Sequence, residues 1–345
     1  MAETLAWSAY CDPALEAIER ERIFARAWQY VGHVGRLGAR GYFAARSGDL
    51  PIVVTRDREG VLRAFLNVCR HRGSIVATGE AERETLQCPY HSWTYGLDGR
   101  LLAAPRAERE GGLETDELRL RPVQLATWGP LLFVNPDPDA PPLEETLGRL
   151  PELVAEAGVD LDALEFRHRD ESSVEANWKL VAENFLECYH CPTAHPGFSA
   201  LVDVSPDAYE LVAGDSFSTQ LGPLRRNEHG LDTEGEVRRS QFHFLWPNTT
   251  INILPGRMNL SIGPILPAGP RRSERFLDYY FAPGVEEEWI AELLAFDAQV
   301  GREDRGLVEN VQRGVGTGLI ERGRLLPESE RLIVEFQRRV RNAVG

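Results

Sequence analysis

The sequence lacks the features of membrane, secreted and disulfide-rich proteins. No stretch approaches the roughly 18 uninterrupted apolar residues of a membrane-spanning helix. Its first residues, MAETLAWSAYCDP, lack the basic residues and the apolar run of a secretory signal. Its five cysteines are few and odd in number, which argues against a disulfide scaffold. We therefore expect a cytoplasmic protein in which particular cysteines serve metal binding or redox chemistry.

Positive charge is also scarce. The 345 residues include 38 Lys and Arg against 53 Asp and Glu, a net charge of −15. Such a surface argues against nonspecific binding to nucleic acid or to anionic membranes. Hydrophobic residues at 43% and charged residues at 26% are ordinary globular values and exclude global disorder. The length suits two domains better than one compact core.

The pattern of the chain divides it into three stretches and predicts an α+β fold. Residues 1–28 contain an amphipathic helix over 13–28, which we expect to pack on the last domain. Residues 29–140 are short β-type runs between glycine turns, as in a small antiparallel barrel or sandwich. Residues 141–345 follow a linker rich in proline and acid. They mix helices at 177–191, 286–313 and 327–342 with strands around 208–222, 240–265 and 273–282.

Two cysteines and two histidines lie in turns after predicted strands: Cys69, His71, Cys88 and His91. Two thiolates and two imidazoles bind either zinc or a [2Fe–2S] cluster with histidines on one iron. Zinc knuckles usually keep like ligands together. Here each turn supplies one cysteine and one histidine, so one iron can take both sulfurs and the other both nitrogens. The spacing favours the cluster, with structural zinc as the alternative.

The residues around these ligands resemble a known motif. Trp93, in the run Tyr-His-Ser-Trp, is expected to cover a charged cluster. The string CRHRG…CPYHSWTYGLDGRL resembles the Rieske motif of the ring-hydroxylating, or Rieske-type non-haem iron, oxygenases. The resemblance covers roughly residues 25–342. It implies a small antiparallel β Rieske domain at 29–140 and a helix-grip-like catalytic domain at 141–345, with an antiparallel sheet, long helices and a mononuclear iron.

The iron site needs two histidines and one carboxylate on one face of the metal. The segment NWKLVAENFLECYHCPTAHPGF, at 177–198, places His190 near the end of a predicted helix. His195, five residues later, lies about 140° around a continuing helix. We therefore expect Pro192 to end the helix, so that a turn brings His195 to the same metal. The family's pair of histidines with four intervening residues matches His190 and His195.

The carboxylate is expected from the predicted helix at 286–313. Asp304 lies within about 40° of the centre of its apolar stripe, whereas Glu303 is about 70° away. An acidic residue on an apolar face must be paired or metal-bound. The family places its third ligand in such a helix, so Asp304 is the expected ligand. The alternative is an aspartate paired with Arg302 or Arg305.

Other polar residues surround His190. Glu187 lies one turn before it, and the resemblance implies that a carboxylate here bridges to a Rieske histidine of the neighbouring subunit. The alternative is a solvated carboxylate. Asn184 is either a donor to a ligand or part of a polar stripe. Cys188 and Cys191 could suggest a further metal site, but on a helix Cys188 points about 160° from His190, which favours packing.

The resemblance also implies partners. Electrons from NAD(P)H would arrive through a separate flavin or iron–sulfur reductase or a ferredoxin. No G-x-G-x-x-G follows a strand, so nicotinamide should not bind this chain. Family members form head-to-tail trimers, in which Glu187 and the Rieske histidines would span the interface. We therefore expect a homotrimer that activates O2 reductively.

The substrate follows from the resemblance less directly. The ECYHC string and the short chain look most like the branch that oxidises choline, glycine betaine, carnitine or proline betaine. A cation needs π faces or carboxylates, so aromatic strands could form a cage, although they are as often core. The alternatives are an aromatic ring-hydroxylating dioxygenase, an aromatic O-demethylase and an electron carrier without oxygenase activity. The candidate cage residues are Phe242, Phe244, Trp246, Tyr279, Tyr280 and Phe281.

Overall fold

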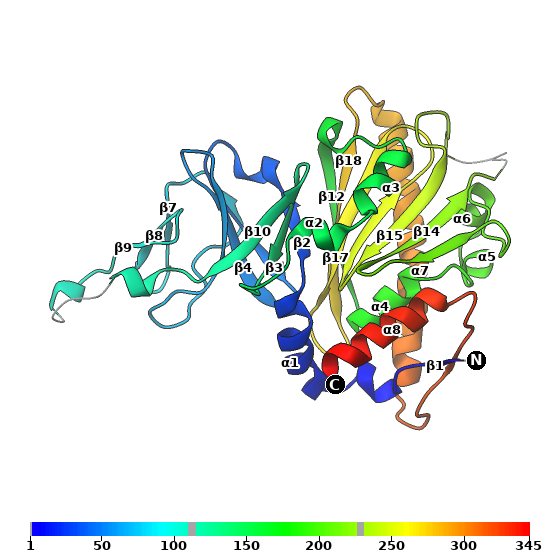
Figure 1. Ribbon diagram of the computed structural model, residues 1–345, viewed down its shortest axis with the longest axis horizontal. Helices are drawn as coiled ribbons and strands as arrows, with labels where there is room; N and C mark the ends of the chain where they lie inside the picture. Colours follow the sequence, from blue (N-terminus) through cyan, green and yellow to red (C-terminus); the bar gives the residue numbers. More distant parts are fainter. Residues whose placement is uncertain (1, 110–114, 226–230) are drawn as a thin grey trace. The chain divides into compact units, whose positions relative to one another are not determined.

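The computed structural model describes residues 2–109, 115–225 and 231–345. These residues form two compact units, each visible in Figure 1. The smaller unit is Phe24–Leu143, and the larger combines Met1–Ile23 with Glu144–Gly345. The sequence predicts domain boundaries at 28/29 and 140/141, whereas the compact units divide at 23/24 and 143/144. Helices and antiparallel sheets occur together, which confirms the predicted α+β class.

The smaller unit is an antiparallel β structure. Its main sheet has the order β2-β11-β10-β5-β4-β3-β6, and a second sheet has the order β7-β8-β9. Buried residues such as Phe43, Ile52 and Val54 form a core on the main sheet, while Phe65 and Tyr95 belong to a second core. The strands are β2 Gln29–His33, β3 Gly41–Ser47, β4 Leu50–Arg56, β5 Leu62–Leu66, β6 Glu80–Ala81, β7 Thr85–Gln87, β8 Thr94–Gly96, β9 Leu101–Ala103, β10 Pro122–Trp128 and β11 Leu131–Asn135. Short 3-10 turns are η2 Phe24–Arg26, η3 Val34–Leu37, η4 Ala107–Arg109 and η5 Thr115–Leu118.

The larger unit is built on an antiparallel sheet of order β12-β18-β17-β16-β15-β14-β13. Its strands are β12 Glu165–Val174, β13 Glu210–Ala213, β14 Phe217–Pro223, β15 Arg239–Leu245, β16 Thr249–Ile253, β17 Asn259–Pro267 and β18 Ser273–Phe281. Its helices are α1 Pro13–Arg22, α3 Leu150–Glu156, α4 Trp178–Phe185, α5 Cys191–Ala194, α6 Pro196–Leu201, α7 Glu287–Val315 and α8 Arg331–Val344, with α2 Leu143–Leu147 at the division of the units. A small sheet pairs β1 Ala2–Glu3 with β19 Arg324–Leu325, and 3-10 turns are η1 Trp7–Tyr10 and η6 Leu161–Ala163.

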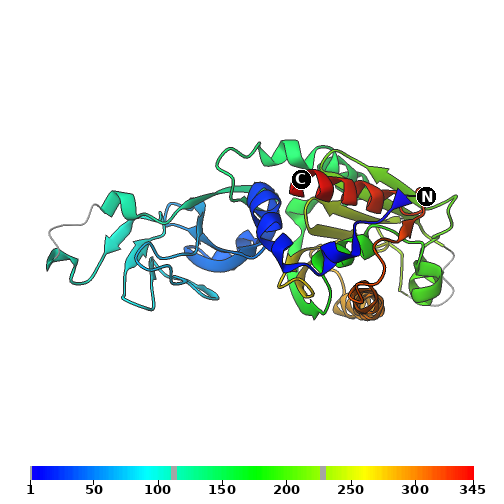
Figure 2. The same cartoon turned by 90° about the horizontal axis from the view of Figure 1, so that it is seen from below.

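Helix α7 lies beside one face of this sheet and is seen nearly end-on in Figure 2. Alternate residues of β18, Arg275, Leu277 and Tyr279, line a cavity together with residues of α7. The period of two along a strand places these three side chains on one face. The sheet and α7 therefore form opposite walls of the cavity.

The N-terminal segment holds α4 in place through hydrogen bonds and an ion pair. Glu19 of α1 is buried, accepts a hydrogen bond from Trp178 Nε1 at 2.7 Å and pairs with Lys179 Nζ at 2.5 Å. Tyr10 donates its hydroxyl to Glu183 at 2.9 Å. Buried charges are stable when they are paired in this way. Residues far apart in sequence thus hold α4, which leads directly to the histidines.

The first helix is shorter than the sequence predicts. We expected residues 13–28, but α1 ends at Arg22 and is followed by the 3-10 turn at Phe24. Phe24 is buried in the smaller unit, where its ring lies against Gly48. The helix therefore ends where the chain passes from one unit to the other.

Strand β12 is an element that the sequence did not reveal. Its ten residues, EFRHRDESSV, are mostly polar and mostly exposed, so they lack the alternation typical of a half-buried strand. The strand forms through its antiparallel pairing with β18.

None of the helices in the described part of the chain combines the length and the apolar composition of a membrane-spanning segment.

Candidate metal centres

Two loops of the smaller unit share one backbone pattern. The loop of Cys69 follows β5 and that of Cys88 follows β7. In each, the cysteine N–H donates to the carbonyl five residues later at 2.8 Å, and the N–H of the fourth residue donates to the cysteine carbonyl at 3.0 Å. That fourth residue, Gly73 or Ser92, has a positive φ of 74° or 58°. Equivalent turns thus present both cysteines.

The thiols lie inside and the imidazoles outside. Cys69 and Cys88 are 3% and 2% exposed, whereas His71 is exposed and His91 is half-buried. The centroids of the two imidazole rings are 4.6 Å apart, and Trp93 stacks on His71 at 4.8 Å. Buried sulfurs and outward nitrogens suit a cluster whose histidine-bound iron faces the surface.

The pKa of the Cys88 thiol favours metal ligation. Burial alone would raise this pKa, but the backbone N–H groups of Tyr90 and His91 and the Cys69 side chain lower it below the ordinary value. Because a thiolate is the metal-binding form, the loop stabilises the form of Cys88 that can bind a metal. The hydroxyl of Tyr95 also lies 3.3 Å from Cys69 Sγ.

In the larger unit, the predicted helix 177–191 is wrong at its C-terminal end. Helix α4 ends at Phe185, whose carbonyl accepts a hydrogen bond from the Gln220 side chain at 2.5 Å. The Glu187 carboxylate then accepts the N–H groups of Tyr189 and His190. A side chain that bonds nearby N–H groups competes with the helix. His190 therefore lies in a turn.

Pro192 also acts differently from the prediction. It begins α5 in its first turn, where its missing N–H costs nothing, so it does not end a preceding helix. His195 lies between α5 and α6, with φ −124° and ψ 71°. This break between two short helices brings the His195 ring to His190.

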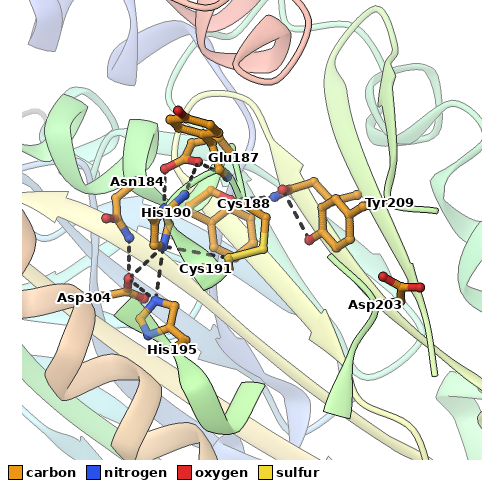
Figure 3. The surroundings of a disulfide bond; sticks show 12 residues. Asn184, Glu187, Cys188, His190, Cys191, His195, Asp203, Tyr209 and Asp304 are labelled. Carbon is orange, nitrogen blue, oxygen red and sulfur yellow. Dashed lines mark hydrogen bonds and ion pairs between the residues drawn. A yellow bond between two sulfur atoms is a disulfide. The ribbon is translucent and has the colours of Figure 1, made fainter. Parts of the chain in front are cut away.

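The side chains of His190, His195 and Asp304 point toward one another in Figure 3. His195 Nε2 lies 3.1 Å from His190 Nε2 and 2.9 Å from Asp304 Oδ1, and His190 Nε2 lies 3.4 Å from the same oxygen. Nitrogens about 2.1 Å from a divalent metal and at right angles to each other are about 3.0 Å apart. These atoms therefore fit three ligands on one face of a metal, the arrangement of the 2-His-1-carboxylate iron sites.

Carboxylates hold the outer side of both imidazoles. Glu187 contacts His190 Nδ1, and Glu303 Oε2 lies 2.8 Å from His195 Nδ1. Such contacts orient a ligating histidine so that Nε2 faces the metal. Asn184 Nδ2 donates to Asp304 Oδ1 at 2.8 Å. The sequence missed Glu303, because the helical wheel turned it away from the apolar stripe and its partner is a histidine distant in sequence.

Asp304 contacts the histidines and Asn184. Within residues 2–109, 115–225 and 231–345, neither Arg302 nor Arg305 forms an ion pair with it inside 4.0 Å. Arg302 instead donates to Gln299 at 2.5 Å. The alternative of an arginine-paired aspartate is therefore not observed.

The pKa values reflect this concentration of charge. Burial alone would lower the pKa of His190, but hydrogen bonds to Asp304 and Glu187 raise it to about 9. Burial would raise the pKa of Asp304, yet the two histidines and Asn184 hold it well below its usual range. A metal ion would replace the protons of the imidazoles, so that its binding releases protons.

Cys188 and Cys191 form a disulfide, with their Cα atoms 5.0 Å apart (Figure 3). The predicted packing of Cys188 is confirmed, because the residue is buried in a cluster with Cys191 and Phe198. The disulfide itself was not predicted from the sequence. On a continuous helix Cys188 and Cys191 would not have been expected to bond, whereas the turn after α4 directs Cys188 toward Cys191. The other three cysteines, Cys11, Cys69 and Cys88, are free.

A cavity of about 290 Å³ opens onto His190, His195 and Asp304. Of the six candidate cage residues, Phe242 and Tyr279 line it. Phe244 and Trp246 instead pack on Phe336 of α8. Tyr280 packs on Phe166 and Phe281 on Trp289. The other aromatic residues that line the cavity are Phe185, Phe198 and Tyr209.

Comparison with protein families assigns both units. Residues 27–127 match the Rieske [2Fe-2S] domain, and residues 161–345 match the catalytic domain of the ring hydroxylating alpha subunits. The fold and the two sites thus define the class of Rieske-type oxygenases. The chain belongs to the ring hydroxylating alpha subunit family. It is an oxygenase component with a [2Fe–2S] domain and a catalytic domain of the mononuclear iron type.

Similar proteins include two monooxygenases. The carnitine monooxygenase oxygenase subunit of Escherichia coli (strain K12) is 34% identical over 334 residues, 95% of this chain and 88% of that protein. The chloroplastic choline monooxygenase of Beta vulgaris is 32% identical over 335 residues, 95% of this chain and 74% of that protein.

Solved structures show the same fold. A quaternary ammonium Rieske monooxygenase in complex with an inhibitor has a TM-score of 0.88 and 30% identity, over 100% of this chain and 96% of that chain. Naphthalene 1,2-dioxygenase from Rhodococcus sp. has a TM-score of 0.80 at 21% identity, over 97% and 93%. At this low identity, the comparison with naphthalene 1,2-dioxygenase shows a shared fold and nothing more.

Proposed function

We propose that this oxygenase hydroxylates or demethylates a small quaternary ammonium compound. The observation that carries the proposal is the cluster of His190, His195 and Asp304 at a partly aromatic cavity of about 290 Å³. The supporting comparisons are the relatives named for carnitine and choline oxidation. In this reaction one oxygen atom of O2 enters a C–H bond and the other leaves as water. The reductase supplies the two electrons needed, and two protons are consumed.

The ligand assignments belong to this proposal. Cys69, Cys88, His71 and His91 would hold the [2Fe–2S] cluster, with Trp93 stacked on His71. A bound iron at the second site would supply reductive activation of O2 beside the substrate. His190, His195 and Asp304 would hold that iron, because their ligand atoms all lie within 4.8 Å of one another.

Three polar side chains orient the ligands. Glu187 and Glu303 hold the Nδ1 side of the two histidines, which directs each Nε2 inward. Asn184 donates to Asp304 Oδ1 and thereby limits rotation of the carboxylate. Asn184 thus acts as a positioning residue in this proposal.

The electron route is assigned to a homotrimer. Glu187 would connect His190 to a Rieske histidine of the neighbouring subunit. The exposed ring of His71 suits such a contact, because an exposed imidazole can approach another chain. A separate reductase or ferredoxin would deliver the electrons, and the cytoplasmic location remains a prediction.

The second candidate is oxidation of an aromatic ring or an aromatic ether. The five aromatic side chains that line the cavity favour it, because they suit an apolar ring as well as a cation. An electron carrier is disfavoured, since a carrier has no use for a second group of metal-binding side chains.

Coupled turnover tests the proposal. The reconstituted protein should carry about three irons per chain and show cluster absorption. With a surrogate reductase, NADH-dependent O2 uptake should yield product from choline, glycine betaine or carnitine. Product from aromatic acids alone would contradict the quaternary ammonium assignment, and about two irons without turnover would support the carrier.

A further inference from the structure

One carboxylate on the cavity wall takes no part in the metal site. Asp297 of α7 lines the cavity seven residues before Asp304. Seven residues of α-helix rise about 10.5 Å and return to nearly the same face. Asp297 is therefore two turns farther along the wall that carries the metal ligand. Tyr279, on the opposite wall, donates its hydroxyl to Asp297.

The charged form of Asp297 is only partly compensated by its neighbours. Burial raises its pKa, while the Tyr279 hydroxyl and the positive charge of Arg275 oppose that rise, and Asp304 and Asp170 add to it. In the described part of the chain, Asp297 forms no ion pair with Arg275 or any other base inside 4.0 Å. A carboxylate removed from water gains stability from a cation, and the cavity leaves room for one.

Most of the other charged side chains on the cavity wall are basic, so the Asp297 carboxylate is needed to attract a cation. Away from the metal site they are Asp170, Arg275, Arg302 and Arg305. The Nε atom of Arg305 is buried and has no hydrogen-bond partner among the residues that the structure describes. Three arginines repel a cation, so a cationic substrate needs an acidic group inside the cavity.

The spacing suits a trimethylammonium group. Such a group has no N–H to donate, so carboxylates and aromatic faces are what can bind it. Heavy atoms in contact are about 3.5–4.0 Å apart, and a C–N bond is about 1.5 Å long. The far carbon of a trimethylammonium group in contact with Asp297 therefore lies about 6–7 Å from the carboxylate, which is less than the rise of about 10.5 Å between Asp297 and Asp304. The rings of Tyr279 and Phe242 line the same space.

We propose that Asp297 is the counter-ion of the substrate's ammonium group and determines the preference for a cation, with Tyr279 as its positioning residue. This inference rests on the proposed function, since it names the residue that recognises the quaternary nitrogen. With Asp297 in this role, the oxygenase selects its substrates by charge at a residue that is separate from the metal ligands.

Binding to the anaerobic holoenzyme, measured by calorimetry, tests the inference. The ligands are choline, glycine betaine, L-carnitine and 3,3-dimethylbutan-1-ol, in which carbon replaces the nitrogen of choline. In Asp297→Asn, we expect the Kd of the preferred cation to rise at least tenfold and the Kd of the neutral analogue to stay within a factor of three. Tyr279→Phe should reduce the ratio of the affinity for the cation to the affinity for the neutral analogue. A merely structural role of Tyr279 would leave this ratio unchanged.

Asp170→Asn is the matched control, because it removes the same charge from an exposed residue of the wall. Its cation affinity should change less than threefold, with iron content and cluster absorption equal in all variants. Equal cation affinity in Asp297→Asn and the wild type would overturn the inference and leave the proposed function standing. A wild-type protein that binds no cation of the panel would overturn both.

Discussion

Nδ1 of His195 lies 2.8 Å from Oε2 of Glu303, so a glutamate adjacent to Asp304 in sequence orients a histidine distant in sequence. Glu303 is itself held by Gln299, whose Nε2 donates to Oε1 at 2.6 Å. Helix α7 therefore carries both the proposed ligand Asp304 and the carboxylate that orients the proposed ligand His195. In metal sites such outer contacts set the tautomer and the orientation of the imidazole.

Glu303→Gln should weaken iron binding at the mononuclear site by roughly 10–100-fold, because the His195 ring loses its charged partner. Iron affinity is measured by titration of the iron-depleted site, and the cluster by visible absorption, which should not change. Glu309→Gln, on the same helix but with its carboxylate bonded to the Glu175 N–H, is the control. Unchanged affinity in Glu303→Gln would contradict the assigned role.

Asp304→Ala should empty the mononuclear site and leave the [2Fe–2S] cluster in place. The reason is that two histidines remain without the carboxylate that balances the metal's charge. Elemental analysis should fall from about three irons per chain to about two. Iron retained at three per chain would point to a different carboxylate ligand.

Glu187→Gln should retain both metals but lose most turnover. The amide oxygen can still accept a hydrogen bond from His190 Nδ1, so the ring keeps its orientation. The negative charge that Glu187 contributes to the proposed electron route is removed. The rate at which the reduced cluster is reoxidised by O2 and substrate is the measurement. Glu187→Asp, which keeps the charge, should be less impaired, and full activity in Glu187→Gln would refute the bridge.

The stability of the protein should depend on Glu183. Burial raises the pKa of this carboxyl from 4.5 to about 7, against hydrogen bonds from Tyr10 and Gln337. Between these pH values the folded state binds more protons than the unfolded state. The contribution of Glu183 to the free energy of unfolding therefore falls as pH rises, by at most about 1.4 kcal/mol per pH unit.

Chemical denaturation of the wild type and of Glu183→Gln, at several pH values from 4.5 through 7 and on to about 8.5, measures this effect. The difference in unfolding free energy should shift in favour of the variant as pH rises and stay constant above about pH 7. A difference that does not vary with pH would show that Glu183 titrates normally.

The sequence predicted the parts that depend on local spacing. The candidate ligand pairs Cys69 with His71 and Cys88 with His91 lie close in sequence, so their spacing alone places them in two turns. Asp304 was chosen from the family resemblance together with helical periodicity, which holds along the 29 residues of α7 and places Asp304 beside the two histidines. Its role as a metal ligand stays a prediction. The class of fold followed from the same kind of pattern.

The remaining features depend on contacts that periodicity does not contain. Glu187 bonds the N–H groups of the turn after α4, and this ends the regular pattern on which the positions of His190 and Cys188 were predicted. The alternation of β15 placed Phe242 and Phe244 on one face, but Phe336 of α8 contacts Phe244. Tertiary packing decides which part of such a face lines the cavity.

Asp297, Glu303 and Asp304 all belong to the uninterrupted helix α7, which fixes the spacing between the proposed counter-ion Asp297 and the proposed metal ligand Asp304. Because the helical rise is fixed, the distance between those two points resists change by loop motion. A single-residue insertion between Asp297 and Glu303 would rotate one group about 100° relative to the others. An enzyme of this fold can therefore adapt to a longer or shorter substrate by exchanging side chains along α7, while the helix keeps its length.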